Sequence, residues 1–239
     1  RQRQMCIRDS ILSDFENSEI SHLMIVTDGV LGHLPFEVFL TERGIKEQDY
    51  RQIPYLLKKY TISYNYSMSL WKENLGQQHS TATKGILGIA ADYSQKDKTK
   101  VDVPHRASHL RSLRDMLGEL PAAQEEVKNL STLFNGNFWM GATANESNFK
   151  AQVPDYKIVH LAMHGLLNTR SPILSSLAFT ENGDPIEDNF LEAWEIAHLK
   201  LNAELVVLSA CETGYGKFQQ GEGVMSLARS FMYAGAPAL

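Results

Sequence analysis

The chain has 239 residues, of which 43% are hydrophobic and 21% are charged, a composition typical of a globular protein with a sizeable core. Its net charge of −5 gives no general reason to expect binding to nucleic acid or to an anionic membrane. The apolar runs are far shorter than the roughly 20 residues of a membrane-spanning helix. The two cysteines, Cys6 and Cys211, lie too far apart in sequence to suggest a disulfide framework, so we expect a cytoplasmic protein.

The first part of the chain predicts two strands around a compact apolar segment. Residues 1–10 show neither helical nor strand periodicity, and we expect them to be a non-native or frayed leader outside the fold. Apolar runs rich in β-forming residues predict strands at 22–27 and 59–64, and Asp28 begins a turn signal. We interpret residues 11–80 as the N-terminal part of the domain.

From residue 84 to residue 239, which we interpret as the second part of the domain, predicted strands alternate with predicted helices. The strands are expected at 84–90, 138–140, 157–163 and 205–209, with a hairpin arm at 176–185. The helices are expected at 121–134, from a capping-box pattern at 143–146 to before residue 154, at 190–199, and after residue 223. This alternation predicts an α/β fold with a mostly parallel central sheet covered on both faces.

The end of the sequence predicts an interrupted element. Gly235 is a helix stop signal, and Pro237 opens a new extended segment that ends after two more residues. We therefore expect the sequence to be a fragment at both ends, with a native fold that continues past residue 239.

Two of the predicted strands lead directly into residues that can do chemistry. The strand at 157–163 runs into His164 and Gly165, and the strand at 205–209 runs into Cys211. Ligands of open α/β sheets bind outside the carboxyl ends of the strands, so these side chains share one rim if the strands are parallel. If the strands are also neighbours, we expect the imidazole and the thiol to come within reach of each other.

A histidine beside a cysteine is suited to acyl transfer. A free thiol with a pKa of about 8.5 is only slightly ionised at neutral pH, and a histidine can take its proton or stabilise the thiolate. The thiolate attacks a carbonyl, the histidine protonates the leaving amine, and the backbone N–H groups of Gly165 and Cys211 are candidates for an oxyanion hole. The spacing of 47 residues from His164 to Cys211 is close to the roughly 50 of caspases.

Each of these residues also has a structural interpretation. Cys211 can fill a core, His164 can be a hydrogen-bonded structural histidine, and we expect His160 to pack against the sheet rather than bind a metal. Asp28 could line a substrate pocket or only form a turn, and Glu212 could face substrate or solvent. The sequence shows no ligand spacing of a metal site and no phosphate-binding loop, so no metal or cofactor is expected.

Three motifs together resemble the CHAT domain, a caspase-like domain often found downstream of tetratricopeptide repeats. They are LAMHG at 161–165, LSACETG at 208–214 and GEGVMSLAR at 221–229. Segments at 26–37 and 141–149 are also similar to the family, so the resemblance covers residues 20–239. The chain departs from the family pattern at Met163, where threonine is usual.

The resemblance implies a caspase-type three-layer α/β/α sandwich over residues 11–239, with a catalytic part at 84–239 and its C-terminal end missing. It implies a caspase- or separase-like cysteine endopeptidase in which Cys211 is the nucleophile, His164 is its base and Gly165 belongs to the oxyanion hole. The expected partner is a protein or peptide substrate, with regulation by tetratricopeptide repeats or a sensor module outside this sequence. The alternatives are a catalytically silent scaffold or ligand-sensing interaction module and, less favoured, a thiol-dependent α/β hydrolase or transferase.

Overall fold

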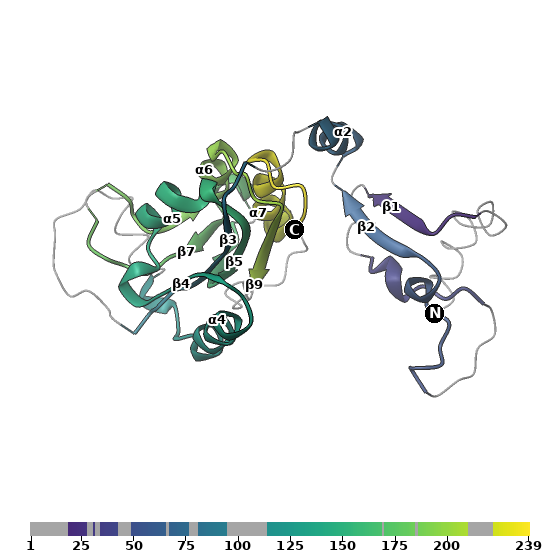
Figure 1. Cartoon of the computed structure of the whole chain (residues 1–239), viewed down its shortest axis with the longest axis horizontal. Helices are drawn as coiled ribbons and strands as arrows, with labels where there is room; N and C mark the ends of the chain where they lie inside the picture. Colours follow the sequence, from purple (N-terminus) through teal and green to yellow (C-terminus); the bar gives the residue numbers. More distant parts are fainter. Residues whose placement is uncertain are drawn as a thin grey trace. The chain divides into compact units, whose positions relative to one another are not determined.

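The computed structural model describes residues 19–27, 31, 34–42, 49–65, 67–76, 81–94, 114–168, 170–184, 186–209 and 222–239. The chain forms two compact units, Arg1–Glu73 and Asn74–Leu239, whose boundary lies inside helix α2 (Met68–Gly76) (Figure 1). None of the helices in the described ranges is long and apolar enough to cross a membrane.

The first unit is built on a pair of parallel strands. β1 (His22–Val26) pairs with β2 (Thr61–Asn65), which confirms both predicted strands, although the second begins two residues later than expected. Two short 3₁₀ turns, η3 (Phe36–Val38) and η4 (Leu56–Lys58), connect them. The turns and the residues that follow them supply a small buried cluster, whose members are Phe36, Phe39, Leu56 and Tyr60.

The second unit contains a central sheet of four parallel strands among the described residues. Their spatial order is β4 (Gly136–Met140), β3 (Lys84–Ala90), β5 (Tyr156–Ala162) and β9 (Leu205–Ser209). All four coincide with strands that the sequence predicts. Near-continuous apolar runs are typical of parallel strands that are buried on both faces, which explains why the sequence predicts β3 and β5 well, whereas β4 stands at the end of the order and is only partly buried.

The two faces of this sheet bury different residues, because side chains alternate along each strand. Helix α4 (Pro121–Leu133) packs Ala123 and Val127 against Ala90 and Ala162 on one face. The other face forms the larger core, which receives side chains from α5 (Glu146–Gln152), α6 (Ala193–His198) and α7 (Glu222–Tyr233). Figure 1 shows α4 on the opposite side of the sheet from α5 and α6.

A second, antiparallel sheet follows the end of β5 and corrects one prediction. It consists of β6 (His164–Leu166), β7 (Ser176–Ala178) and β8 (Phe190–Glu192) in that order. The helix predicted at 190–199 is wrong for its first three residues, which pair with β7 and bury their side chains before α6 begins. The helix signals there are local, whereas the pairing partner lies earlier in the chain, and the tertiary contact prevails.

The capping box predicted at Thr143 is also wrong. The N-cap of α5 is Asn145, whose side-chain oxygen accepts a hydrogen bond from the backbone N–H of Asn148 at 2.9 Å. Thr143 instead belongs to a 3₁₀ turn, and its hydroxyl donates to the carbonyl oxygen of Met140. The helix therefore begins at Glu146, which places that carboxylate in the first turn.

The C-terminal segment lies beside β9. Helix α7 ends at Tyr233, and Gly235 has a φ of 114°, a conformation that favours glycine, so the predicted stop signal is confirmed. The N–H of Val206 then donates to the carbonyl oxygen of Ala238 at 3.0 Å. The segment after Pro237 thus continues along the outer side of β9.

Candidate active site

The strands that carry the two predicted catalytic motifs are parallel neighbours. β5 pairs with β9 from Ile158↔Leu205 to Ala162↔Ser209, an offset of 47 positions at every rung. His164 and Cys211 are separated by the same 47 positions and follow the last pair by two residues each. The two strands are therefore both parallel and neighbours, as a shared site of His164 and Cys211 requires.

The structure describes only part of the predicted site. His164 is the first residue of β6, and Gly165 follows it, half-buried, opposite Leu177 of β7. Cys211, Glu212 and Asp28 lie outside the described residues. Met163, which stands where the family usually has threonine, is fully buried in the larger core.

The imidazole of His164 is held from one side by a backbone carbonyl. Its Nε2 lies 2.7 Å from the carbonyl oxygen of Gly118, and the residue is only 1% exposed. A carbonyl oxygen can only accept a hydrogen bond, so Nε2 carries a hydrogen. In the neutral ring the lone pair is then on Nδ1, which is the nitrogen that can take up a proton.

Tyr93 fixes the backbone of His164. The backbone N–H of His164 donates to the Tyr93 hydroxyl at 2.9 Å, and that hydroxyl donates to the carbonyl oxygen of Ala178 at 2.6 Å. The two rings also pack together, with centroids 4.7 Å apart. Burial raises the pKa of Tyr93 well above its usual range, so the hydroxyl stays a neutral donor. The start of β6 is thus tied to the end of β3 and to β7.

Replacing Tyr93 by Phe is expected to lower the free energy of unfolding by about 2 kcal/mol, because it leaves a buried N–H and a buried carbonyl without this partner. Urea unfolding followed by tryptophan fluorescence measures the change. Tyr233→Phe, at a tyrosine that is 61% exposed, is the matched control and should change the free energy by less than about 0.5 kcal/mol. Equal effects of the two variants would show that the Tyr93 hydroxyl does not hold the site.

A hydrogen-bonded group of three side chains joins β5 and β9 to helix α4. Glu126 of α4 accepts hydrogen bonds from Nε2 of His160 at 2.8 Å and from the hydroxyl of Ser209 at 2.9 Å, one at each carboxylate oxygen. His160 belongs to β5, and Ser209 is the last residue of β9. His160 packs on the sheet, as the sequence analysis expects, and its ring bonds to a carboxylate there.

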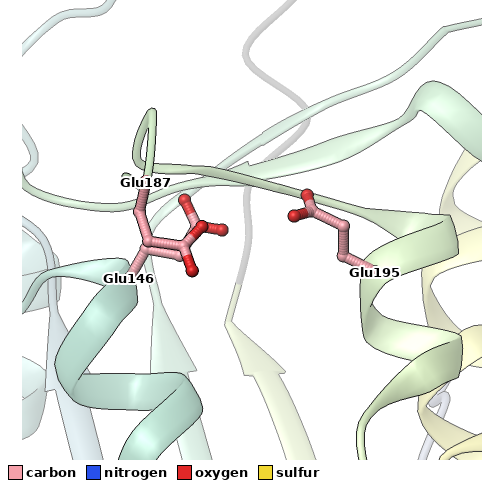
Figure 2. Close-up of side chains that lie close together, drawn as sticks. All are labelled: Glu146, Glu187 and Glu195. Atoms are coloured by element: carbon pink, nitrogen blue, oxygen red, sulfur yellow. The ribbon is translucent and has the colours of Figure 1, made fainter. Parts of the chain in front are cut away.

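On the other face of the sheet, three carboxylates point toward one another from α5, from the segment before β8 and from α6. Figure 2 shows them as Glu146, Glu187 and Glu195, and one oxygen from each lies within 4.8 Å of the others. The ammonium of Lys150 contacts all three, at 2.7, 2.7 and 2.9 Å respectively. These carboxylates have the ligand type and spacing for an oxygen-preferring metal ion, but the Lys150 ammonium already lies among them.

Glu146 is the buried member of this cluster. It is 0% exposed, and neither of its carboxylate oxygens receives a directed hydrogen bond from the described residues. Burial raises the pKa of Glu146 to about 8, although the ammonium of Lys150 acts to lower it. The cluster therefore holds one carboxyl group that is largely protonated at neutral pH.

The sequence analysis missed the supporting residues Tyr93, Gly118 and Glu126. A signal for part of this network was present, because His160 and Ser209 are polar residues inside otherwise apolar strands, and buried polar groups need partners. Their common partner could not be named, because it lies on a helix far away in the sequence. The carboxylate cluster gave no comparable local signal.

Compared with models of known protein families, residues 3–239 match the model of the CHAT domain. The match includes all three motifs that carry the resemblance and extends it from residues 20–239 to residues 3–239. A comparison with curated proteins finds no match to this chain.

Proposed function

Because the chain belongs to the CHAT domain family, which is associated with caspase-like cysteine peptidases, we propose that it is a cysteine endopeptidase. In this proposal Cys211 is the nucleophile, His164 is the base and a protein or peptide is the substrate. The observation that carries it is the parallel register of β5 and β9, whose offset of 47 positions equals the separation of the two residues.

The environment of His164 supports its role as the base. With Nε2 committed as a donor to Gly118, proton exchange takes place at Nδ1. His164 Nδ1 takes the proton of the Cys211 thiol, and the thiolate forms a bond to the carbonyl carbon of the peptide. The same proton passes to the leaving amine as the peptide bond breaks, and water then hydrolyses the acyl-enzyme. The backbone N–H groups of Gly165 and Cys211 stabilise the oxyanion.

The proposal includes features that come from the family. The central sheet with α4 on one face and α5 to α7 on the other is compatible with the caspase-type three-layer sandwich. Asp28 and Glu212 are proposed to line the substrate pocket. Tetratricopeptide repeats or another sensor module outside this sequence are proposed to regulate the activity.

The test is the pH dependence of Cys211 alkylation by iodoacetamide in a Cys6→Ser background. The proposal predicts fast alkylation well below pH 8, because the imidazole stabilises the thiolate. In His164→Ala the profile should move toward that of a free thiol, with a rate at pH 6.5 lower by about tenfold or more. A wild-type profile like that of a free thiol, unmoved by the mutation, would instead favour a silent scaffold.

A further inference from the structure

The hydrogen-bonded group of Glu126, His160 and Ser209 on the α4 face of the sheet takes no part in the proposed chemistry. It lies beside the strand ends that lead to the proposed catalytic residues. Glu126 uses both carboxylate oxygens to bind the two strands that lead to His164 and Cys211. We propose that Glu126 is a positioning residue that holds the carboxyl ends of β5 and β9 together and so sets the separation of His164 and Cys211. This inference rests on the proposed function.

The register of the strands shows what the carboxylate of Glu126 spans. Ser209 pairs with Ala162, and His160 pairs with Val207, so His160 and Ser209 lie diagonally across the two strands. Strands about 4.8 Å apart, with a rise of about 3.3 Å per residue, place such a diagonal pair roughly 8 Å apart. The carboxylate of Glu126 accepts hydrogen bonds from both side chains and so spans this diagonal.

The position of the bridge matters because Ala162 and Ser209 form the last described rung of this ladder. Beyond the end of a ladder the backbone hydrogen bonds no longer fix the spacing, and strand ends open more readily than strand centres. His160 is 7% exposed, so its ring needs a partner, and Glu126 provides one. The carboxylate thus restrains β5 and β9 at the last described rung of the ladder.

The same stretch of chain also contacts the proposed base. The carbonyl of Gly118, three residues before α4 begins at Pro121, accepts from the His164 ring, and Glu126 lies further along that helix. Helix α4 is anchored to the sheet through Val127, the residue after Glu126, which is fully buried. Helix α4 and the segment that precedes it therefore contact three strands, β5 and β9 through Glu126 and β6 through Gly118.

The arrangement of the group excludes a hydrolytic triad of its own. In a Ser-His-Asp triad the histidine lies between the hydroxyl and the carboxylate, so that it can take the hydroxyl proton. Here the carboxylate of Glu126 lies between the hydroxyl of Ser209 and the ring of His160. Among the residues that the structure describes, the hydroxyl donates to a carboxylate and not to an imidazole, so the group holds the strands in place and does not activate the hydroxyl.

The experiment measures Cys211 alkylation against pH in Glu126→Ala and Ser209→Ala, both in the Cys6→Ser background. We expect each variant to slow alkylation at pH 6.5 by about tenfold and to move the profile upward in pH, because the thiol and imidazole are held less closely. Glu126→Gln keeps one acceptor oxygen and replaces the other with an NH2 donor, which the Ser209 hydroxyl oxygen can accept, so it should recover most of the lost rate. Glu125→Ala, which removes an exposed carboxylate from the same helix, should leave the rate unchanged.

Amide hydrogen exchange on the same proteins tests the action on the strands directly. Glu126→Ala should speed exchange at Ser209, the last residue of β9, and leave Val159, near the other end of the ladder, protected. Unchanged exchange at the strand ends overturns the proposal whatever the thiol does. Faster exchange with an unchanged alkylation profile in a protein with a poised thiol also overturns it, because the bridge is then merely structural.

The two readouts separate this inference from the proposed function. A wild-type thiol that reacts like a free thiol contradicts the peptidase, because the Cys-His pair is then not formed. A poised wild-type thiol that Glu126→Ala does not alter contradicts the positioning role alone. Slower alkylation of Cys211 in Glu126→Ala, with recovery of the rate in Glu126→Gln, supports both the peptidase and the positioning role.

Discussion

Replacing Lys150 by Met is expected to lower the free energy of unfolding by about 3 kcal/mol at pH 7. The ammonium of Lys150 donates to Glu187 and Glu195 at 2.7 and 2.9 Å and lies 2.7 Å from Glu146. Burial lowers the pKa of Lys150, but these carboxylates raise it by more, so the side chain stays charged. Methionine keeps the length of the chain and leaves the carboxylates facing one another without a counter-charge.

Urea unfolding followed by fluorescence measures the loss, in a Trp71→Phe background so that the signal comes from Trp139 and Trp194 of the second unit. Lys157→Met is the matched control, because Lys157 lies 3.7 Å from Glu204 and both side chains are about half exposed. An exposed pair of this kind contributes less than about 1 kcal/mol. If the two variants lose the same amount, the Lys150 cluster is not a stabilising centre of the fold.

Glu146→Gln is expected to remove a pH dependence of stability. The pKa of Glu146 is about 8 in the folded chain and 4.5 in its ordinary state, so between these values the folded state binds more protons than the unfolded state. The wild-type free energy of unfolding should therefore fall as the pH rises from about 4.5 to about 8. Each pH unit of this window corresponds to at most about 1.4 kcal/mol.

Glutamine has nearly the shape of glutamic acid and no proton to lose, so the stability of Glu146→Gln should stay nearly flat across this window. The measurement is a series of urea unfolding curves from pH 5 to pH 9. Glu204→Gln, at an exposed glutamate, should retain the wild-type slope. A wild-type stability that rises with pH through this range, or a Gln variant with the same slope, would show that Glu146 is ionised in the folded chain.

The parallel strands were the most predictable part of the fold. The runs at 84–90, 157–163 and 205–209 are apolar nearly throughout, because both sheet faces are covered, and no other element fits so short a continuous run. Their positions along the sequence follow from local composition. Their order in space does not, and the pairing of β5 with β9 in preference to other neighbours required the structure.

The errors lie where distant contacts outweigh local signals. Phe190 and Leu191 precede a strong helix start and were included in it, but they pair with β7. Asn145 caps α5 although Thr143 begins a recognisable capping pattern, because the hydroxyl of Thr143 is engaged with Met140. In both cases the predicted and the observed start of the helix differ by about one turn. Local sequence composition does not distinguish between two starts that are so close.

The candidate site divides in the same way. His164 and Cys211 could be named from the sequence, because each follows a predicted strand in a motif with a recognisable spacing. The residues that support His164 and the strand ends could not, because Tyr93 is 71 residues from His164 and Glu126 is 83 from Ser209. Lys150 likewise meets Glu187 and Glu195 at separations of 37 and 45 residues.

The constant offset between β5 and β9 also has a consequence for when the site can form. Each rung of this pair joins residues 47 positions apart, and the intervening chain contributes the whole antiparallel sheet and α6. Closing so long a segment is entropically costly, so these rungs are expected to form late, after the local elements have folded. A polypeptide still emerging from the ribosome would have made the His164 motif well before the Cys211 strand. The proposed peptidase would thus stay inactive until the Cys211 strand has been made and has paired with β5.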